Sequence, residues 1–475
     1  MRYKVQLVIV DDEGQEVRTQ EVATLEKSGR PMEGIGISLA ESKDVLRHLQ
    51  QALVQDQVGR YLERTKRCAC GAALKTKGHH SVVYRTLFGN IRLRSPRRRR
   101  CPCWPIQEKS ASPLTHLFEG HVAPELQWVL AKCAALVPFG AAAKILKELL
   151  PVDEKLSGQS VRNQALKVAR RLDEDGEPVK ELHPSIGRRI RTWEQWDRWN
   201  RRRAPDRKRI LPPNITMTVA LDGAFIPSRE NGEGHFEALV GNGVRSKGRP
   251  KCFGLVQGSG TTPYVRLYRF LKSQGIQDHH EISFVTDGEQ QFEWLIGSTA
   301  PGARHILDWW HIAKRFEILK RIARGIAGRP EKYYPMIGST IEDEIESAKR
   351  VIWQGRRQSA QFSLYETRRM ARNFRGVHRS YRKLSRRLTE LMGYLRRNED
   401  HLANYAAAYR KGKRISSQLA ESAVNRLVAK RFVKKQQMRW SREGAHLLLQ
   451  VRAAVLNGDL EGAFKRWYPG MMAAS

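Results

Sequence analysis

The chain has 475 residues and carries 85 Lys and Arg against 49 Asp and Glu, a formal net charge of +36. This length is enough for two to four domains, and so large a positive excess indicates a polyanionic partner, most simply nucleic acid. No run of 18 or more apolar residues occurs, and the N-terminus does not have the pattern of a signal peptide. No basic amphipathic or lipidated segment argues for a membrane partner. Six cysteines, four of them in two tight pairs, favour a reducing cytoplasm with one metal site.

Residues 1–66 are expected to form a hairpin of two strands followed by a helix. Residues 3–10 alternate in polarity, and an acidic turn leads from them into a second strand. Ser38-Leu-Ala-Glu41 has the form of a capping box and predicts a helix that extends to about Arg64. One face of this helix either packs on the core or forms a dimer contact. Its apolar residues are Leu46, Leu49, Leu53, Tyr61 and Leu62.

Two cysteine pairs predict a zinc-ribbon-like segment over residues 67–110. Between the pairs, residues 82–87 and 91–94 have strand character around Gly89-Asn90, a hairpin turn signal. A hairpin would bring the two pairs together, as a structural Zn²⁺ held by four thiolates requires. The four ligands would be Cys68, Cys70, Cys101 and Cys103.

The spacing of these cysteines leaves alternatives open. Both pairs are C-x-C, whereas zinc ribbons usually carry C-x-x-C, so four free thiols are the competing interpretation. His79 and His80 are close enough in the chain to substitute as ligands. A run of arginines directly before the second pair is either a solvated face or a contact for DNA phosphates. The run consists of Arg97, Arg98, Arg99 and Arg100.

Residues 111–182 are expected to form a helix-turn-helix DNA-binding domain. Helical periodicity covers residues 124–150 with a break near Pro138, and a further helix is expected over residues 159–173. The start of that helix carries side chains that can read base edges. They include Gln159, Arg162 and Asn163. An all-α core segment without DNA contacts is the alternative.

Residues 183–213 are a basic, proline-containing linker by composition. Trp193, Trp196 and Trp199 recur every three residues and therefore share one helical face. This face is expected to pack onto a neighbouring domain, and stacking on unpaired bases is the second interpretation.

The next domain is defined by two apolar runs, each of which ends on an aspartate. Residues 217–221 precede Asp222-Gly, and residues 282–286 precede Asp287-Gly. Each run predicts a buried strand that is closed by a turn. Two carboxylates side by side are costly unless a cation binds between them. Oxygen ligands favour Mg²⁺, and Mn²⁺ would substitute.

The remaining periodicity places these two strands in one mixed α/β sheet. Further strands are expected over residues 236–240, 252–257 and 304–308, with helices after the last two strands of the series. Three strands followed by strand, helix, strand and helix is the order of an RNase H-like fold, whose first and fourth strands are neighbours. The expected parts are core residues 214–311, a basic all-helical insertion over 312–415, and core residues 416–475.

A third acid is expected to complete the site. Glu421 begins a helix after a basic loop, and Glu289 is the reserve because it is next but one to Asp287. An acidic cluster in the insertion is expected to form ion pairs four residues apart with its basic neighbours instead. The candidates not preferred are Glu293, Asp308 and the cluster Glu342, Asp343, Glu344 and Glu346.

Four motifs follow one another along the chain. They are Leu-Asp222-Gly-Ala-Phe, Val-Thr-Asp287-Gly-Glu, Ile-Leu-Asp308-Trp-Trp-His311, and Glu421-Ser-Ala-Val-Asn425-Arg426 with the later Lys-Lys-Gln-Gln-Met438-Arg439-Trp440. In this order, and with the hairpin between cysteine pairs, the chain resembles bacterial insertion-sequence DDE transposases of the Kra-type group. The resemblance spans nearly the whole chain, and the C-x-C pairs depart from it.

The resemblance implies an RNase H-like catalytic core that is interrupted by the helical insertion. It implies Asp222, Asp287 and Glu421 as the catalytic, Mg²⁺-binding triad, with Asp308 and His311 in a motif of supporting role. It further implies a transposase that binds double-stranded DNA at transposon ends and target, as a homodimer or larger assembly in the bacterial nucleoid. A related nuclease or resolvase, or an inactive DNA-binding regulator, is the alternative.

Overall fold

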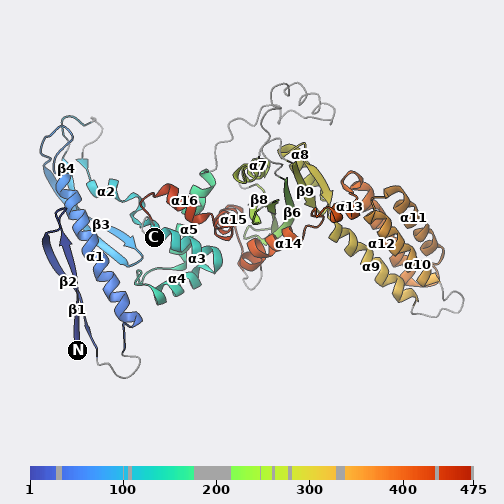
Figure 1. Ribbon diagram of the computed structural model, residues 1–475, viewed down its shortest axis with the longest axis horizontal. Coiled ribbons are helices and arrows are strands. Elements are labelled where there is room, and N and C mark those ends of the chain that lie inside the picture. Colours follow the sequence, from blue (N-terminus) through green and yellow to red (C-terminus); the bar gives the residue numbers. More distant parts are fainter. Residues whose placement is uncertain are drawn as a thin grey trace. The chain divides into compact units, whose positions relative to one another are not determined.

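A computed structural model describes the chain in two compact units, residues 1–172 with 458–475 and residues 173–457 (Figure 1). The described residues are 1–27, 35–99, 101–104, 110–175, 216–246, 248–258, 263–276, 281–327, 337–433 and 438–471. The linker expected over residues 183–213, with its three tryptophans, lies outside them. Helices and strands are mixed, as expected. Within the described ranges, no helix is both long and apolar enough to cross a membrane.

The first unit begins with the expected hairpin and helix. Strands β1 (Arg2–Val10) and β2 (Glu16–Glu26) pair antiparallel, and α1 (Leu39–Arg64) follows. The capping box is confirmed: the backbone N–H of Glu41 donates to Ser38 Oγ at 3.2 Å, and the backbone N–H of Ser38 donates to Glu41 Oε2 at 2.8 Å. Two orphan donors of the first helical turn are thereby satisfied.

The apolar face of α1 differs from the expected stripe. The buried residues are Ala52, Val54 and Val58, whereas Leu46 and Leu53 are 36% and 38% exposed. The two valines pack on a three-stranded sheet together with Tyr61 and Leu62 of the expected stripe, and α1 also packs on β2.

This second sheet holds the cysteine pairs at one end. Strands β3 (Thr76–Thr86) and β4 (Gly89–Arg99) form the expected hairpin, and β5 (Ser110–Ala111) extends it. The turn is Leu87-Phe88, because Thr86 pairs with Gly89, so the prediction of a Gly89-Asn90 turn is wrong by two residues. Gly89 instead begins β4 with a φ of +113°, a conformation that glycine adopts at little cost.

Helices complete the first unit. They are α2 (Pro113–Leu117), α3 (Pro124–Leu136), α4 (Phe139–Leu149), α5 (Gly158–Glu174) and α16 (Leu460–Trp467). The expected helix over residues 159–173 is therefore confirmed as α5, and the expected break near Pro138 separates α3 from α4. α5 buries Val161, Ala165 and Leu166, and α16 packs against α3.

The second unit is built on a five-stranded sheet in the order β10-β9-β6-β7-β8. Its strands are β6 (Thr216–Pro227), β7 (His235–Arg245), β8 (Lys251–Val256), β9 (Glu281–Thr286) and β10 (Arg304–Leu307). β6, β9 and β10 are parallel, while β7 and β8 are antiparallel to their neighbours. The expectation that the first and fourth strands are neighbours is confirmed.

Two details of this sheet differ from the expectation. β6 does not end at Asp222: it continues to Pro227, with Asp222 paired to Val240 and Gly223 to Leu239. Within the extended strand, Glu237 of β7 occupies the space where a side chain at position 223 would lie, so glycine fits there. A helix, α7 (Pro263–Ser273), also lies between β8 and β9 where none was expected.

Helices cover both faces of the sheet (Figure 1). α7 and α8 (Gln290–Thr299) bury apolar side chains against one face, with Phe270, Phe284 and Phe292 at the centre of that core. α14 (Gln418–Val424), its π-helical continuation η4 (Asn425–Val433) and α15 (Arg442–Asn457) pack on β6, β7 and β8. Gly254 of β8 faces the side chains of Leu427 and Leu449 on these helices.

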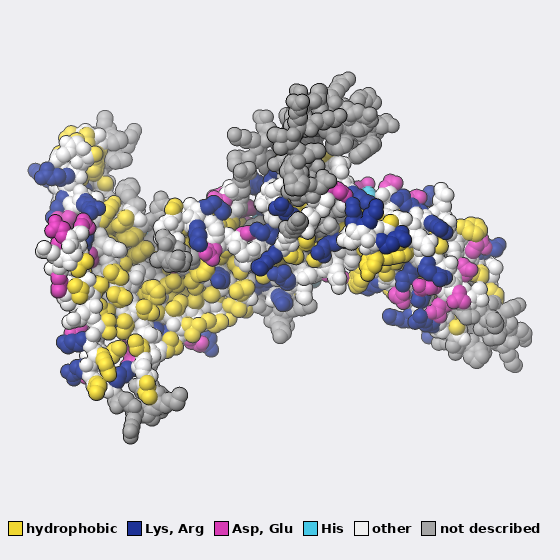
Figure 2. Space-filling model, in the orientation of Figure 1, with side chains coloured by type: hydrophobic (Ala, Val, Ile, Leu, Met, Phe, Trp, Pro, Cys, Tyr) yellow, Lys and Arg dark blue, Asp and Glu magenta, His cyan; other side chains and the backbone are white. Residues whose placement is uncertain are grey.

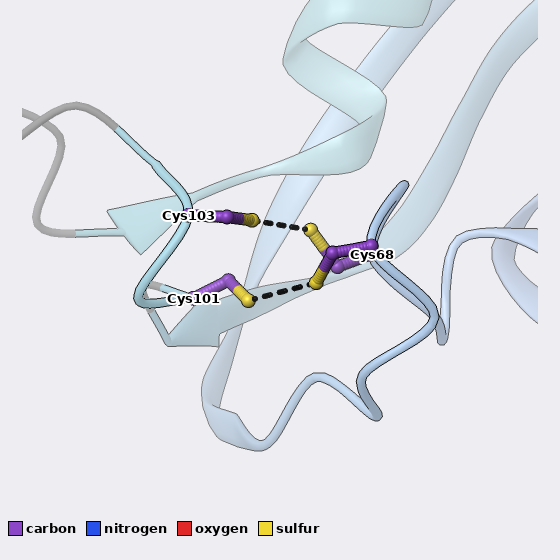
Figure 3. Close-up of side chains that lie close together, drawn as sticks. Cys68, Cys101 and Cys103 are labelled. Carbon is purple, nitrogen blue, oxygen red and sulfur yellow. Dashed lines mark hydrogen bonds between the residues drawn. The ribbon is translucent and has the colours of Figure 1, made fainter.

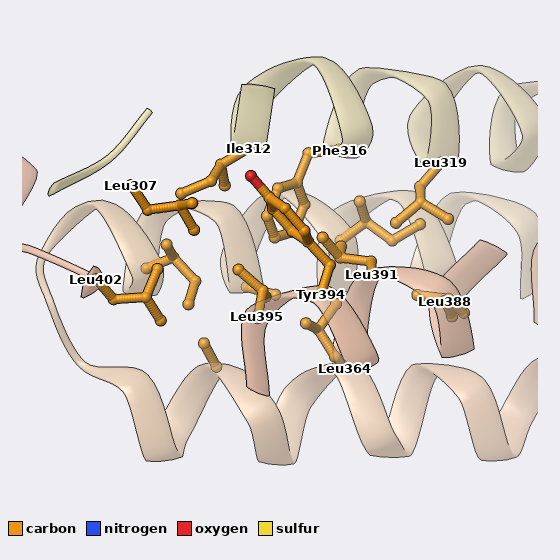
Figure 4. Close-up of a cluster of buried hydrophobic side chains, with 14 of the residues drawn as sticks. Leu307, Ile312, Phe316, Leu319, Leu364, Leu388, Leu391, Tyr394, Leu395 and Leu402 are labelled. Carbon is orange, nitrogen blue, oxygen red and sulfur yellow. The ribbon is translucent and has the colours of Figure 1, made fainter. Parts of the chain in front are cut away.

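The helices expected over residues 312–415 are present in the described part of that range. It contains α9 (Trp309–Ala327), α10 (Ile337–Trp353), α11 (Arg357–Asn373), α12 (Arg379–Arg397) and α13 (Tyr405–Arg410). α9 to α12 form a four-helix bundle, because each helix packs on the next and α12 returns to α9. Figure 4 shows its buried interior, which includes Phe316, Leu364 and Leu388.

The acidic cluster of the insertion makes its ion pairs between helices, so the prediction of pairs within one helix is wrong. Glu346 of α10 pairs with Lys320 of α9 at 2.7 Å, and Glu342 pairs with Arg324 at 2.7 Å. The helices lie side by side, which brings opposite charges closer across the interface than along the helix.

Candidate functional site

Four cysteine side chains form one cluster at the end of the β3–β4 hairpin (Figure 3). Cys68 Sγ lies 3.3 Å from Cys103 Sγ, and Cys70 Sγ lies 3.5 Å from Cys101 Sγ. All four sulfur atoms are within 4.8 Å of one another. A tetrahedral site with Zn–S bonds of about 2.3 Å has sulfur–sulfur distances of about 3.8 Å, so the cluster could bind a metal ion such as zinc.

The surroundings of Cys68 favour its thiolate, whereas the neighbouring thiols raise the pKa of Cys103. The backbone N–H of Cys70 and the neighbouring thiol of Cys103 lower the pKa of Cys68 to about 6. The indole N–H of Trp104 also donates to Cys68 Sγ at 3.2 Å. A tight turn with Gly71 at a φ of +87° closes the first pair. The C-x-C spacing is therefore compatible with a four-sulfur centre.

The histidines considered as substitute ligands are not part of this cluster. His80 Nε2 lies 3.2 Å from Ser112 Oγ, which in turn lies 2.8 Å from Ser95 Oγ. The described cluster contains four cysteines and neither His79 nor His80.

The second candidate site gathers acids from three elements of the sheet unit. Asp222 lies in β6, Asp287 directly follows β9, and Glu421 lies in the first turn of α14. α14 packs on β6 and β7, and Asn242 Nδ2 of β7 donates to the backbone oxygen of Leu419 at 3.3 Å. This packing holds the helix that carries Glu421 over the strand that carries Asp222.

The Asp287 turn is fixed from several sides. Gly288 has a φ of +86°, and Asp287 Oδ1 accepts the backbone N–H of Glu289 at 3.1 Å. Tyr394 of α12 donates its hydroxyl to the backbone oxygen of Asp287 at 2.7 Å. A side chain at Gly288 would meet Asn398 Oδ1 at 2.4 Å. The helical insertion therefore supports the loop that carries Asp287.

The pKa of Asp222 is shifted by burial and by the charges of its neighbours. Burial is the largest cause that raises its pKa, to about 7, and the nearby carboxylates of Asp287, Glu421 and Glu289 raise it further. The backbone N–H of Gly223, which donates to Asp222 Oδ1 at 2.8 Å, opposes this shift. Several acids around a half-buried carboxyl group form an anionic cluster of the kind that a divalent cation stabilises.

The acids are less tightly grouped than the cysteines. Within the described ranges, the cysteine cluster is the one group of three or more His, Cys, Asp or Glu whose ligand atoms all lie within 4.8 Å. The carboxylates of Asp287, Glu289 and Glu421 thus lie close enough to raise the pKa of Asp222. They do not form a group as tight as the cysteines.

Asp308 is placed differently from these acids, inside the fold. Its side chain is 0% exposed, accepts the backbone N–H of Trp310 at 2.7 Å and binds the hydroxyl of Ser417. His311 Nε2 lies 3.7 Å from Asp308 Oδ2. The carboxylate thus caps α9 and ties it to the start of α14.

Some residues beside the site could not be predicted from a pattern in the sequence. Gln291 Nε2 donates to Glu289 Oε2 at 2.7 Å and to Glu237 Oε1 at 2.8 Å, and Gln257 donates to Gln291 Oε1 at 2.8 Å. Glu237 sits inside a strand with no neighbouring turn or motif, so only the pairing of β6 with β7 places it there.

The residues expected to contact DNA are only partly accessible. Gln159 and Asn163 are exposed at the start of α5 and hydrogen-bond to each other at 2.8 Å, while Arg162 is half-buried. Arg97 and Arg99 are exposed, and Arg100 lies outside the described residues.

The side chain of Arg98 is turned inward and is not available to contact DNA phosphates. It is buried and donates to Thr76 Oγ1 at 2.8 Å and to the backbone oxygen of Leu62 at 3.5 Å. The alternation of side chains along β4 turns this one arginine of the run inward.

A comparison with protein-family models and a search of curated proteins each gave no match.

Proposed function

We propose that the chain is a DDE transposase with an RNase H-like core that cleaves DNA at transposon ends and joins it to target DNA. The observation that carries the proposal is the placement of Asp287, after β9, and of Glu421, on α14, near Asp222 of β6. Burial raises the pKa of Asp222 to about 7, and these carboxylates add to the rise. The strand order β10-β9-β6-β7-β8, with three parallel strands and an antiparallel edge, supports it because this is the RNase H-like order. The bundle between β10 and α14 fits the expected insertion.

The proposed chemistry needs carboxylate ligands and no protein nucleophile. Asp222, Asp287 and Glu421 would hold two Mg²⁺ ions, which stabilise charge on the attacking and leaving oxygens of a phosphodiester. The three carboxylates would supply the oxygen ligands that Mg²⁺ prefers.

Each acid has a distinct place in this proposal. Asp222 is held in the sheet by the Gly223 N–H, and Asp287 is held by the turn that Tyr394 braces. Glu421 reaches the pair from α14, so its position depends on how that helix is anchored. These three side chains orient a water, and then a 3′-hydroxyl, in line with the phosphate to be attacked.

The remaining parts support DNA as the substrate. The net charge of +36 favours a polyanion, and exposed polar side chains at the start of α5 suit the reading of bases. The cysteine cluster would hold a Zn²⁺ that stabilises the first unit, in the region of exposed Arg97 and Arg99.

The test uses purified protein and labelled DNA that carries the terminal inverted repeats found beside the gene. We expect Mg²⁺-dependent cleavage and joining, lost by at least about a hundredfold in Asp287→Ala. Glu390→Gln, an exposed acid on α12, is the matched control and should act as the unaltered chain does. Joining that survives Asp287→Ala would overturn the site.

The alternatives give different outcomes in the same assay. DNA binding without any cleavage by the unaltered protein would favour a regulator. Cleavage of branched DNA without joining would favour a resolvase.

A further inference from the structure

The four-helix bundle contains a strongly basic pocket at the end of α11. Its volume is about 260 Å³, and it is formed by one helix and the turn that follows it. The lining residues are Tyr365, Arg368, Arg369, Arg372, Asn373 and Arg375. Four guanidinium groups around one hollow repel one another, and no acid lines the pocket to offset them.

The arginines of the pocket differ in their ion pairs. Arg369 pairs with Glu366 at 2.6 Å, but neither Arg372 nor Arg375 forms an ion pair within the part of the chain that the structure describes. Arg368 lies over the Tyr365 ring at 5.4 Å, and its Nε atom is buried without a hydrogen-bond partner there. Four arginines that line a hollow without an acid favour an anionic ligand with several oxygens.

Two aromatic side chains extend the same face of α11. Phe362 is 68% exposed and Tyr365 is 47% exposed. With Arg369 and Arg372, they follow one another at intervals of three, four and three residues, so the four share one side of the helix. Exposed aromatics interleaved with arginine are the arrangement that binds single-stranded nucleic acid, since bases stack while guanidinium groups hold phosphates.

The charge around the pocket supports a polymer rather than a small ligand. Sites for small molecules are mostly apolar with a few polar groups, whereas this pocket is lined by cationic and polar side chains. In the view of Figure 2, Lys and Arg side chains are spread over the bundle, interspersed with acidic ones. A long anion can contact several of these cations at once.

We propose that this pocket on α11 is a phosphate-binding site for an unpaired DNA strand, with Tyr365 and Phe362 stacking on its bases. This inference rests on the proposed function, since it assigns the bundle a share in holding the DNA. It adds a recognition surface that the catalytic residues do not include.

The test measures binding without divalent ions, so that cleavage plays no part. Fluorescence anisotropy of the full chain with a labelled single-stranded 30-mer is followed from about 50 to 200 mM NaCl. We expect Arg372→Ala/Arg375→Ala to weaken binding about tenfold and to reduce the salt slope by about 1.4, since each single-strand phosphate contact contributes about 0.7. The matched control is Arg382→Ala/Lys383→Ala on α12, which removes the same charge from exposed positions.

Phe362→Ala provides the second variant, because an exposed side chain can be removed without disturbing the core. We expect it to weaken single-stranded binding about five- to tenfold and duplex binding less than twofold. Equal losses in the pocket variant and the α12 control, or equal losses on both DNA forms for Phe362→Ala, would overturn the proposal. Competition by millimolar inorganic phosphate without any effect of the variants on DNA binding would also overturn it.

The two proposals fail separately. If the pocket variant cleaves, joins and binds DNA normally, the pocket proposal is wrong and the transposase proposal stands. If DNA binding depends on the pocket but the unaltered chain never cleaves DNA, the pocket proposal stands and the transposase proposal is wrong.

Discussion

The hydroxyl of Ser417 donates a hydrogen bond to the buried carboxylate of Asp308, 109 positions earlier in the chain. The same aspartate accepts the backbone N–H of Trp310 at 2.7 Å and donates its own N–H to the backbone oxygen of Thr286 at 2.8 Å. Ser417 in turn accepts the backbone N–H of Glu421 at 3.1 Å. Through its backbone and its carboxylate, Asp308 therefore connects the end of β9, the start of α9 and the turn of α14 that carries Glu421.

Ser417→Ala is expected to disturb activity more than stability. It removes one hydrogen bond to a buried charge, which costs about 1–3 kcal/mol in the free energy of unfolding. Because the lost bond anchors the Glu421 turn, we also expect at least a tenfold fall in the rate of DNA joining at saturating Mg²⁺. Denaturant unfolding and a joining assay measure the two effects.

Ser416→Ala is the matched control for this prediction, since Ser416 Oγ accepts a long 3.3 Å bond from the backbone N–H of Gln418. A double-mutant cycle with Asp308→Asn should give a coupling energy above about 0.5 kcal/mol. Identical behaviour of Ser417→Ala and Ser416→Ala would show that the buried bond has no role in placing Glu421.

Gly288→Ala is expected to damage the Asp287 turn. The φ of +86° is strained for alanine, and the added carbon would lie 2.6 Å from Leu307 Cδ1 and 2.4 Å from Asn398 Oδ1. We expect a loss of about 2–4 kcal/mol in stability from strain and overpacking together, with a loss of cleavage. Thermal unfolding measures the first effect.

Gly297→Ala separates this effect from a general effect of glycine replacement. Gly297 lies in α8, where an added carbon meets no atom within 4 Å. This variant should be neutral or more stable by up to about 1 kcal/mol, because alanine favours a helix. Equal losses of stability at both positions would contradict the proposed strain.

The helices and strands that could be predicted from the sequence are those whose signals lie within a few neighbouring residues. The capping box at Ser38 is four residues long, and the alternation or apolar character of each strand is set by its own burial. Asp287 followed by glycine was expected to end a strand, and it does. The continuation of β6 past Asp222 was missed, because a glycine in a strand signals a turn unless a partner strand is known to pair across it.

The contacts that shape the site depend on residues far apart in the chain. Tyr394 and Asn398 reach the Asp287 turn only because α12 returns to α9 in the bundle. Asp308 was expected as a supporting acid, and its cap of α9 and bond to Ser417 require the packing of two distant segments. No local pattern of apolar residues encodes such pairings, so the sequence predicted the acids but not what holds them.

The cysteine cluster is expected to bind about one equivalent of zinc. Cys70→Ser changes an exposed ligand and should lower the zinc content of purified protein to below half an equivalent. It should also lower the melting temperature of the first unit, because a metal that binds only the folded state stabilises it. Cys133→Ser, outside the cluster, is the control and should retain full zinc. If the unaltered protein contains less than half an equivalent of zinc, the prediction of a zinc site is wrong.

Asp222→Asn is expected to stabilise the protein while abolishing cleavage. The native pKa of Asp222 is raised to about 7, largely by burial, above the value of about 3.9 in an unfolded chain. Between about pH 4 and pH 7 the unfolded state loses this proton while the native state keeps it. The contribution of Asp222 to native stability therefore falls as the pH rises through this window and stays low above it.

Asparagine carries no charge and can still accept the N–H of Gly223. After discounting for partial exposure, we expect Asp222→Asn to gain about 1–3 kcal/mol at pH 8 without metal, and nothing at pH 4. Mg²⁺ should raise the melting temperature of the unaltered chain and not that of the variant, because the ion relieves the repulsion that Asp222 shares with Asp287 and Glu421. Asp343→Asn, an exposed acid on α10, is the control and should show no pH-dependent gain. A gain for Asp222→Asn that is equal at pH 4 and pH 8 would contradict the raised pKa, and with it the anionic cluster.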